Sequence, residues 1–389
     1  MKKKIYNAIL KLDEWLRKND CKGYDPFDGL NSNILRFFTF NNKYLRIIQQ
    51  QSIRRIPINI RPLVGIQKTY SSKGMGFLAR GYIRLYRATN KEEYSDKAIA
   101  CLDWLINNQC SGYSGACWGN HFDYQSRVFF LPKGVPTIVW VSLIGHAFLD
   151  AYDCFHDKKY LDIADSACQH ILYDLETYKD DDDICISYIP IENKQVHNAN
   201  TLGASFLART YSITGCRKYL DLATKAINYT VKYQRKDHTW YYGENSNLHW
   251  VDNFHTAYVL DSIKYYIEST GDKQHKHMEA LMAGYGVWKN IFFLKDGIPK
   301  YYINKTMPID IQCASQAIDT LQYFSDIDKS GIDLATKIAN WTIDNMQDDS
   351  GYFYFRKYKI GIINKTPTLH WGQATMLCAL GGLYKALEK

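Results

Sequence analysis

Apolar positions in this chain recur at helical spacing, in two kinds of segment that alternate. From Tyr219 onward, apolar residues fall at positions 219, 222, 223, 226, 227 and 231, and Lys, Asp and Asn fill much of the rest. One apolar stripe with a polar opposite face predicts a helix that packs on a single side. Segments such as 199–213 and 370–387 are apolar or small nearly all round, which predicts inner helices buried on every side.

The one-sided segments form a repeat. Three of them start at Tyr94, Tyr219 and Ile332, and each ends in Gln fifteen positions later. A fourth starts at Tyr160, and weaker copies begin near His275 and at the N-terminus. Six outer helices that alternate with inner ones predict an all-α chain of six helical hairpins.

The connections alternate in length. Short turns join each inner helix to the following outer helix, whereas outer-to-inner connections run to about 17 to 50 residues. In stacked hairpins all the long loops must then emerge at one end. Small residues in the inner segments, such as Gly76, Ala79 and Gly81, allow the close helix contacts that a tight ring needs.

Three motifs carry a family resemblance: GYDPFDGLNS at 23–32, DNFHT at 252–256 and HWGQA at 370–374. The six hairpins resemble the (α/α)6 toroid of six-hairpin glycosidases, polysaccharide lyases, sugar epimerases and the C-terminal domain of glucuronyl C5-epimerases. Through the motifs the chain resembles proteins of bacterial capsule and surface-polysaccharide gene clusters. The resemblance implies one toroid domain over residues 1–389, with short strands in the long loops. Residues 28–68 are expected to form an insertion beside the cleft.

Composition narrows the function. Aromatic residues make up 15% of the chain, with 31 Tyr, which fits either a ligand-lined cavity or an AT-rich genome. A net charge of +8 is too diffuse for nucleic acid but suits an acidic substrate. Charged residues interrupt the N-terminal segment before an apolar run long enough for a signal peptide or a membrane span can form. No stable membrane insertion is therefore expected. Ten Cys without metal-binding spacing indicate reduced thiols in the cytoplasm, with no zinc and no cofactor. The sequence does not give the oligomeric state.

The long loops predict where chemistry would occur. If they share one end of the ring, the side chains at the starts of successive inner helices converge there. The candidate catalytic residues, chosen because His and Asp transfer protons near neutral pH, are His121, Asp123, His197, Asp252, His255 and His370. The candidate substrate-binding residues, aromatic platforms with amide and cationic groups around them, are Trp118, Arg127, Asn198, Trp240, Asn253, Tyr302, Tyr354, Arg356, Trp371 and Gln373.

Several of these residues have an equally good structural interpretation. Asp252 and Asp310 immediately precede apolar helices, where Asp is a common N-cap. Asp25 and Asp28 flank a Pro and a Gly, as turn-forming Asp residues do. Tryptophans that follow the outer helices can equally be core residues.

Aromatic faces bordered by His, Asn and Arg suit pyranose rings, so a saccharide is the expected ligand. Epimerisation or elimination at a uronate needs a base, a proton donor and groups that hold the carboxylate, and this is the preferred hypothesis. Glycoside hydrolysis by paired carboxylates is an alternative, although no diagnostic pair is evident. A non-catalytic protein that binds a glycan or a lipid-linked intermediate is a third.

Overall fold

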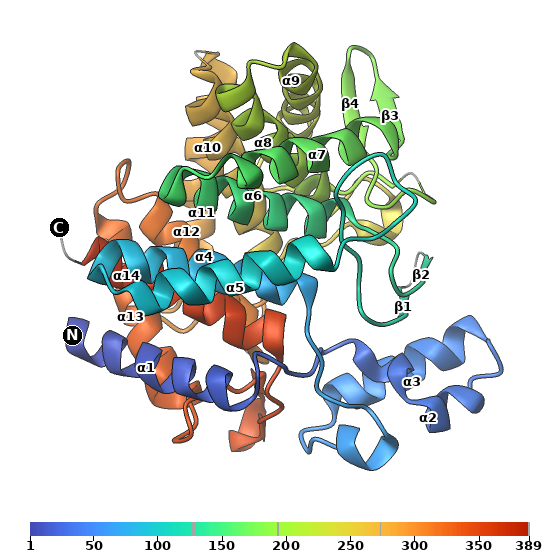
Figure 1. Cartoon of the computed structure of the whole chain (residues 1–389), viewed down its shortest axis with the longest axis vertical. Helices are drawn as coiled ribbons and strands as arrows, with labels where there is room; N and C mark the ends of the chain where they lie inside the picture. Colours follow the sequence, from blue (N-terminus) through green and yellow to red (C-terminus); the bar gives the residue numbers. More distant parts are fainter. Residues whose placement is uncertain (127–128, 193, 273, 388–389) are drawn as a thin grey trace.

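The computed structural model describes residues 1–126, 129–192, 194–272 and 274–387, and fourteen α-helices account for most of them. Twelve of these helices form two concentric rings (Figure 1). The inner ring consists of α4 (Ser72–Thr89), α6 (Ile138–Phe155), α8 (His197–Thr214), α10 (Asn253–Thr270), α12 (Ile311–Tyr323) and α14 (Thr375–Ala386). The outer ring consists of α1 (Lys2–Lys18), α5 (Glu92–Asn107), α7 (Lys158–Tyr173), α9 (Arg217–Lys232), α11 (His275–Ile291) and α13 (Ser330–Met346).

The inner ring closes on itself. Each inner helix packs against the next, and α14 returns to pack against α4. Helix α1 lies on α14, so the sixth hairpin is assembled from the two ends of the chain. The predicted (α/α)6 toroid is therefore confirmed, including the placement of the N-terminal helix in the outer ring.

Close packing of the inner ring depends on small residues. A Cβ atom on Gly145 in α6 would lie 2.3 Å from the Phe206 ring of α8, far inside van der Waals contact. Gly286 in the outer helix α11 has no atom within 4 Å of the corresponding position. The two glycines therefore provide a matched comparison.

Gly145→Val is expected to lower the free energy of unfolding by about 3 kcal/mol, because α6 and α8 must separate to admit the side chain. Gly286→Ala is expected to raise it by about 0.5–1 kcal/mol through lower entropy of the unfolded chain. Urea titration of both variants measures the difference. Equal stability of Gly145→Val and the parent would contradict the close approach of α6 and α8.

The long loops lie at one end of the toroid, which we call the mouth, and contain the only strands among the described residues. These are β1 (Tyr124–Gln125) with β2 (Phe130–Leu131), β3 (Thr177–Asp180) with β4 (Asp183–Ile186), and β5 (Ile309–Asp310), β6 (Arg356–Lys357) and β7 (Ile363–Asn364) in one sheet, all antiparallel. Side chains of Ser71, Thr137, Asp252 and Asp310 cap four inner helices there. The inner helices thus direct their N-terminal N–H groups and positive dipole ends to the mouth.

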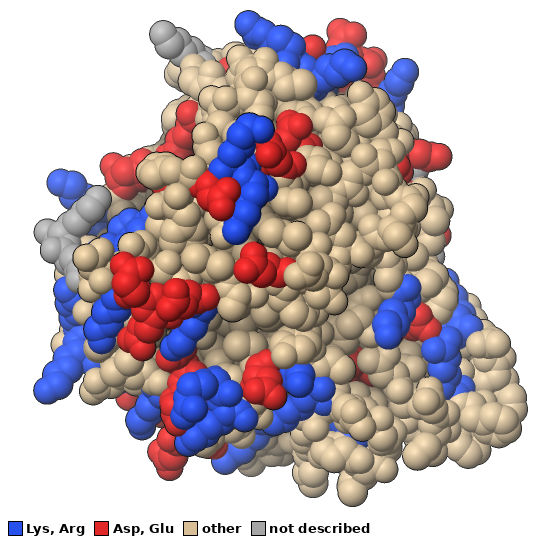
Figure 2. Space-filling model, in the orientation of Figure 1, with Lys and Arg blue, Asp and Glu red and all other residues tan. Residues whose placement is uncertain are grey.

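The segment predicted as an insertion forms a lobe beside the rings. It contains α2 (Asn33–Phe37), α3 (Lys43–Arg55) and the 3₁₀ turns η1 (Asp28–Asn31) and η2 (Arg61–Val64). A buried ion pair of 2.8 Å between Arg61 and Asp28 holds its base. Gln50 donates to the backbone of Gln125 and accepts from it, which attaches α3 to a mouth loop. In Figure 2 the lobe projects at lower right, with an outer surface that is mostly uncharged.

One helix in the described part of the chain is long and apolar enough to cross a membrane, namely α6. It is an inner helix of the ring, and 67% of its apolar window is buried inside the protein. Its hydrophobicity is therefore accounted for by the core that it helps to form.

Candidate functional site

The first turns of the inner helices place chemically active side chains around the mouth. In chain order they are Lys73 (α4), Trp140 (α6), His197 (α8), His255 (α10), the cap residue Asp310 (α12), and His370 with Trp371. The last two lie on a π-helical segment, η5 (Leu369–Ala374), that precedes α14. Single π turns occur often at functional sites because the wider turn redirects side chains.

His255 is fixed by the residue that caps its own helix. Oδ1 of Asp252 accepts the backbone N–H of His255 at 3.0 Å, and Oδ2 lies 2.7 Å from His255 Nδ1. The same Oδ2 accepts the indole N–H of Trp250 at 3.0 Å. Asp252 is buried, while His255 is 22% exposed. The carboxylate thus orients the imidazole through Nδ1 and leaves Nε2 available, so Asp252 is both an N-cap and a partner of His255.

His197 shares a pocket of about 220 Å³ with His255 and Asp252. Its Nε2 lies 2.7 Å from Oε1 of Glu244, and its Nδ1 lies 3.3 Å from the Thr230 hydroxyl. Asn198 also lines the pocket, and its buried Oδ1 has no hydrogen-bond partner. The pocket therefore combines two imidazole–carboxylate pairs with an unsatisfied amide oxygen, which is an arrangement able to donate, accept and orient.

His370 forms a third imidazole–carboxylate pair nearby. Its Nδ1 lies 2.6 Å from Oδ2 of Asp25, both groups are buried, and Nε2 of His370 has no hydrogen-bond partner. Burial alone would raise the pKa of Asp25, but His370 and then His121 hold it below its ordinary value. Burial lowers the pKa of His121 to about 4, so this imidazole is neutral near pH 7.

Lys73 is a buried cation next to this pair. No carboxylate lies within ion-pair distance among the described residues, and Nζ instead lies over aromatic rings, 4.9 Å from Trp140 and 5.8 Å from Trp371. Burial lowers the pKa of Lys73 to about 8, with Asp25 opposing the change. A group that titrates so near neutrality can itself exchange protons.

Trp371 joins the two groups of His residues. Its indole N–H donates to Asp310 at 3.0 Å, and its ring packs edge-on against Phe254 at 5.3 Å and against His370 at 5.7 Å. Phe254 in turn contacts His255 at 4.0 Å between ring centroids. His255 and His370 are thus neighbours across one aromatic pair. His197 lies in the pocket with His255 and has no direct contact with His370.

Two guanidinium groups lie on the other side of Trp371. Arg356 pairs with Asp310 at 2.5 Å, whereas Arg54, from the insertion, has no carboxylate partner in the described chain. The Arg54 side chain stacks on Phe27 at 4.3 Å, and its buried Nε has no hydrogen-bond partner. Burial and then repulsion by Arg356 lower the pKa of Arg54. Within the described part of the chain, the mouth therefore holds one guanidinium, that of Arg54, without a carboxylate of its own.

Two predicted aromatic platforms belong to the core instead. Trp118 is fully buried, donates its indole N–H to the Leu105 carbonyl at 2.9 Å and stacks on Phe148. The expectation that it flanks a sugar is wrong, because its ring fills the gap between hairpins. Trp240 is also buried and donates to the Thr230 carbonyl at 2.8 Å, although one edge of it borders the pocket of His255.

The side-chain amides of two predicted substrate-binding residues are hydrogen-bonded to other groups of the protein. Asn253 donates to the Lys300 carbonyl and accepts the indole N–H of Trp288, each at 2.9 Å. Gln373 accepts the backbone N–H of Phe353 and donates to its carbonyl. A spacing of three would place His370 and Gln373 on one face of an α-helix, but the segment is π-helical and the two side chains have separate partners. Neither amide is free to bind substrate.

The remaining candidates lie apart from the pocket or on its rim. Asp123 pairs with Arg36 of the insertion at 2.6 Å and accepts the backbone N–H of Lys133, so it stabilises a loop and is not the partner of His255. Tyr354 donates to Asp348, next to the end of α13. Tyr302 is 40% exposed and its backbone pairs with Asp252, so it remains a rim residue. Arg127 lies outside the described residues.

Sequence reasoning undervalued four residues of the site. Asp25 was interpreted as a turn residue, and its Oδ1 does accept the N–H of Phe27, but Oδ2 faces His370. Glu244 carried no local signal, because its partner His197 is distant in sequence, and the same holds for Arg54 beside Arg356. Lys73 was missed entirely. Its signal was a cation in the first turn of an otherwise apolar inner helix.

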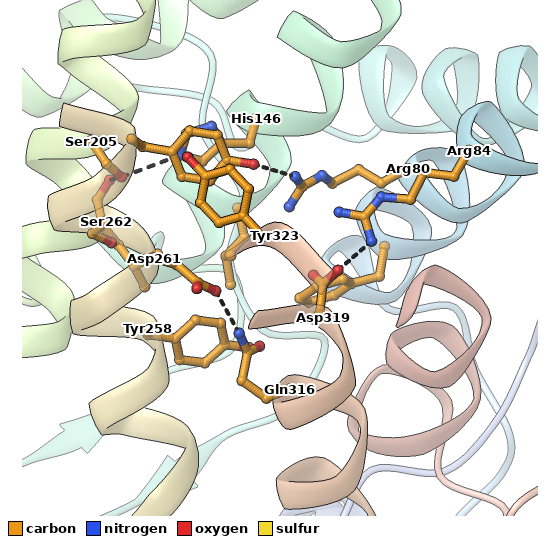
Figure 3. A pocket seen from close by; sticks show the side chains of 14 residues that line it. Arg80, Arg84, His146, Ser205, Tyr258, Asp261, Ser262, Gln316, Asp319 and Tyr323 are labelled. Atoms are coloured by element: carbon orange, nitrogen blue, oxygen red, sulfur yellow. Dashed lines mark hydrogen bonds and ion pairs between the residues drawn. The ribbon is translucent and has the colours of Figure 1, made fainter. Parts of the chain in front are cut away.

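A second polar cavity lies deeper, within the inner ring and toward the short-turn end (Figure 3). It encloses about 420 Å³ not filled by atoms and is lined by residues of α4, α6, α8, α10 and α12. Arg80 pairs with Asp150 and Arg84 with Asp319, while Asp261 accepts from Gln316 at 2.8 Å and from Thr320 at 3.0 Å. Burial and then Asp319 raise the pKa of Asp261 well above its ordinary value. Burial therefore favours the protonated, uncharged form of Asp261 inside the ring.

No group of three His, Cys, Asp or Glu side chains in the described part of the chain is arranged to hold a metal ion. The His residues of the mouth each face a carboxylate, a hydroxyl or an aromatic ring instead.

The neutral state of His121 predicts acid sensitivity. Because its pKa is about 4 in the folded protein and about 6.5 in the unfolded chain, its contribution is complete above pH 6.5 and is lost as the pH falls to 4. That contribution is about 3 kcal/mol. His121→Asn is expected to reduce the loss of unfolding free energy over this range, measured by urea titration at several pH values. An unchanged pH profile would contradict the buried neutral imidazole.

Comparison with known proteins supports the fold. No protein-family model matches the chain, and no curated protein resembles it in sequence. A cellobiose 2-epimerase from Bacillus thermoamylovorans is similar in structure, with a TM-score of 0.66, 13% identity, and coverage of 82% of this chain and 88% of the other. An unsaturated glucuronyl hydrolase specific for heparin has a TM-score of 0.65 and 13% identity, with coverage of 100% of this chain and 98% of the other. The GH76 α-mannanase of Bacteroides thetaiotaomicron has a TM-score of 0.62 and 17% identity, with coverage of 83% of this chain and 87% of the other. At these identities the likeness establishes the toroid fold alone.

Proposed function

We propose that this chain is a carbohydrate-active enzyme that moves a proton at a uronate residue of a bacterial surface polysaccharide, by epimerisation or elimination. The observation that carries the proposal is the imidazole of His255, oriented through Nδ1 by Asp252 and lining a pocket that also holds the His197–Glu244 pair. A base oriented in this way is what abstraction of a proton next to a carboxylate requires.

The roles follow from which ring nitrogens are free. His255 Nε2 takes the proton from the sugar carbon, and Asp252 stabilises the imidazolium that results. His370, when protonated at Nε2, returns a proton from another side, which gives epimerisation. Loss of the leaving oxygen instead gives elimination. Both outcomes pass through one carbanion, so one set of residues serves either.

Positive charge at the mouth suits a carbanion next to a carboxylate. Arg54 and Arg356 lie beside Tyr301, whose hydroxyl also experiences the charge of Asp252. A uronate carboxylate placed between the guanidiniums would lie next to the pocket of His255. The N-terminal ends of the inner helices add partial positive charge to the same region.

Glycoside hydrolysis is the second candidate, and a specific observation defines it. At the mouth the carboxylates of Asp25, Glu244, Asp252 and Asp310 each face a His or an Arg, so none of them resembles a protonated general acid. A carboxyl group whose burial favours the protonated form, as hydrolysis needs, lies in the deeper cavity, namely Asp261. A hydrolase would therefore depend on Asp261 and not on His255.

The cellular setting completes the proposal. All ten Cys are free thiols, which supports a reducing compartment such as the cytoplasm. A saccharide is the expected partner and nucleic acid is not. A surface-polysaccharide precursor assembled inside the cell would meet the enzyme there.

A substrate panel tests the proposal. The purified chain is incubated with glucuronate-, galacturonate- and mannuronate-containing polysaccharides and with neutral glycans. NMR then reports changes of configuration, ultraviolet absorbance reports new double bonds, and a reducing-sugar assay reports cleavage. We expect inverted or unsaturated uronates from one acidic glycan. Reducing ends released in a reaction that needs Asp261 but not His255 would establish hydrolysis instead, and binding without any product would establish a binding protein.

A further inference from the structure

The outer end of the insertion is an exposed apolar surface that neither the ring nor the mouth explains. Its residues, which we call the apolar tip, have side chains that are 60–76% exposed. They are Ile34, Phe37, Phe38, Phe40, Tyr44 and Ile48. Clustered exposed aromatic residues of this kind mark a surface that binds something.

The apolar tip contributes little to the fold. Helix α2 buries none of its residues, and α3 buries only Gln50 and Ile53. The ring of Phe37 lies 5.6 Å from that of Phe38 and 6.3 Å from that of Phe40, so these rings contact one another. Phe40 has a φ of +47°, a costly conformation for a bulky residue. Its exposed ring recovers none of that cost by burial.

The charge carried by the lobe's own residues is of one sign. Residues 29–68 contain seven Lys and Arg and no Asp or Glu, in a chain whose net charge is +8. Lys43 and Arg55 are exposed and have no carboxylate partner among the described residues. In Figure 2 the outer part of the lobe is tan, with blue and some red where it joins the body. An apolar surface with a mainly basic border is complementary to an anionic one that has an apolar interior.

We propose that the apolar tip docks this protein on the surface of an anionic lipid bilayer. Phenylalanine and tyrosine side chains enter the boundary between headgroups and acyl chains, and the basic residues remain at the phosphates. Helix α3 has 13 residues, about 20 Å at 1.5 Å per residue, so it lies on a membrane and does not cross it. The Phe37–Phe40 turn is the point of entry.

Docking would also place the mouth at the membrane. Gln50 of α3 bonds to the mouth loop at Gln125, and Arg54 lies beside Arg356 and Asp310. A protein held by its insertion would therefore present the mouth close to the bilayer, where a lipid-linked saccharide is anchored. The inference concerns attachment and is independent of the reaction proposed above.

Flotation of the full chain with vesicles tests the proposal. We expect binding to vesicles of equal phosphatidylglycerol and phosphatidylcholine, little binding to phosphatidylcholine alone, and weaker binding as salt rises above about 0.1 M. The triple variant Phe37→Ser, Phe38→Ser and Phe40→Asn is expected to bind at least about tenfold more weakly. These side chains are exposed, so its melting temperature should match that of the parent.

Matched controls distinguish the apolar tip from the rest of the surface. Tyr173→Ser with Ile191→Ser and Ile213→Ser removes exposed apolar groups elsewhere and should leave vesicle binding unchanged. Lys43→Glu with Arg55→Glu should weaken binding at least about tenfold, whereas Lys225→Glu with Lys276→Glu, on outer helices, should not. No binding to anionic vesicles, or equal binding by the triple variant, would overturn the proposal. The proposal would also be overturned if the parent chain did not bind vesicles but self-associated, and the triple variant abolished that self-association.

Discussion

Replacement of His255 by Gln is expected to lower kcat on a uronate substrate by about 10²–10⁴-fold, the range that a positioned acid or base contributes. Gln keeps a hydrogen bond to Asp252 but cannot accept a proton from carbon. His255 is partly exposed and packs no large cavity, so the melting temperature should change by less than about 2 °C. Steady-state kinetics and thermal unfolding of the same preparation measure both quantities.

His275→Gln is the matched control for His255→Gln. His275 lies on the outer helix α11, is 85% exposed and pairs only with Glu279 on its own helix. The same chemical change there should leave kcat within about twofold. Loss of turnover in both variants, or in neither, would remove His255 from the proposed role.

Replacement of Arg54 by Gln is expected to raise KM for an acidic glycan by about 10–100-fold and to change kcat little, because a charge-assisted contact to the carboxylate is lost. Arg54 is held beside Arg356 without a carboxylate of its own. Stability should therefore remain or rise in the variant. A structural role would give the opposite result, namely a lower melting temperature with KM unchanged.

Arg55→Gln is the control, because the neighbouring guanidinium is exposed and lies outside the mouth. It should preserve KM for the same glycan. A neutral analogue of the substrate should bind parent and Arg54→Gln alike. If Arg54→Gln weakens the neutral analogue equally, Arg54 shapes the mouth and does not recognise the carboxylate.

The fold could be predicted from the sequence because it depends on local patterns of apolar and polar residues. The Gln that ends each of the segments starting at Tyr94, Tyr219 and Ile332 marks the repeat, and the alternation of loop lengths fixes the end at which the loops gather. Inner and outer helices then follow from whether polar residues occupy one face. Each of these signals lies within about 20 residues, where periodicity is informative.

The site could be predicted only in part from the sequence, because closure of the ring decides which side chains become partners. The sequence allowed Asp252 to be either an N-cap or a catalytic residue, and it has features of both. Its Oδ1 caps α10, and its Oδ2 faces the His255 imidazole. Asp25 meets His370 across almost the whole chain, and Arg54 of the insertion meets Arg356 near the C-terminal end of the chain. Such pairs carry no local signal.

Errors at Trp118, Asn253 and Gln373 share one cause. Each has a side chain suited to binding sugars, and each satisfies a backbone or indole group of the fold instead. Residue type shows what a side chain can do, but only the partners around it show whether it is free. The π-helical turn at His370 had no signal in the spacing, because a segment of 6 residues is too short to distinguish its period from that of an α-helix.

Solvent isotope incorporation tests the central claim, proton transfer at a uronate carbon, most directly. The chain is incubated with its acidic glycan in D2O, and the hydrogen on the carbon next to the carboxylate is followed by NMR and mass spectrometry. The account predicts deuterium on that carbon in an epimerised product, or loss of its hydrogen with a new double bond in an eliminated one, and neither with His255→Gln. Product formed while that hydrogen stays in place would contradict it.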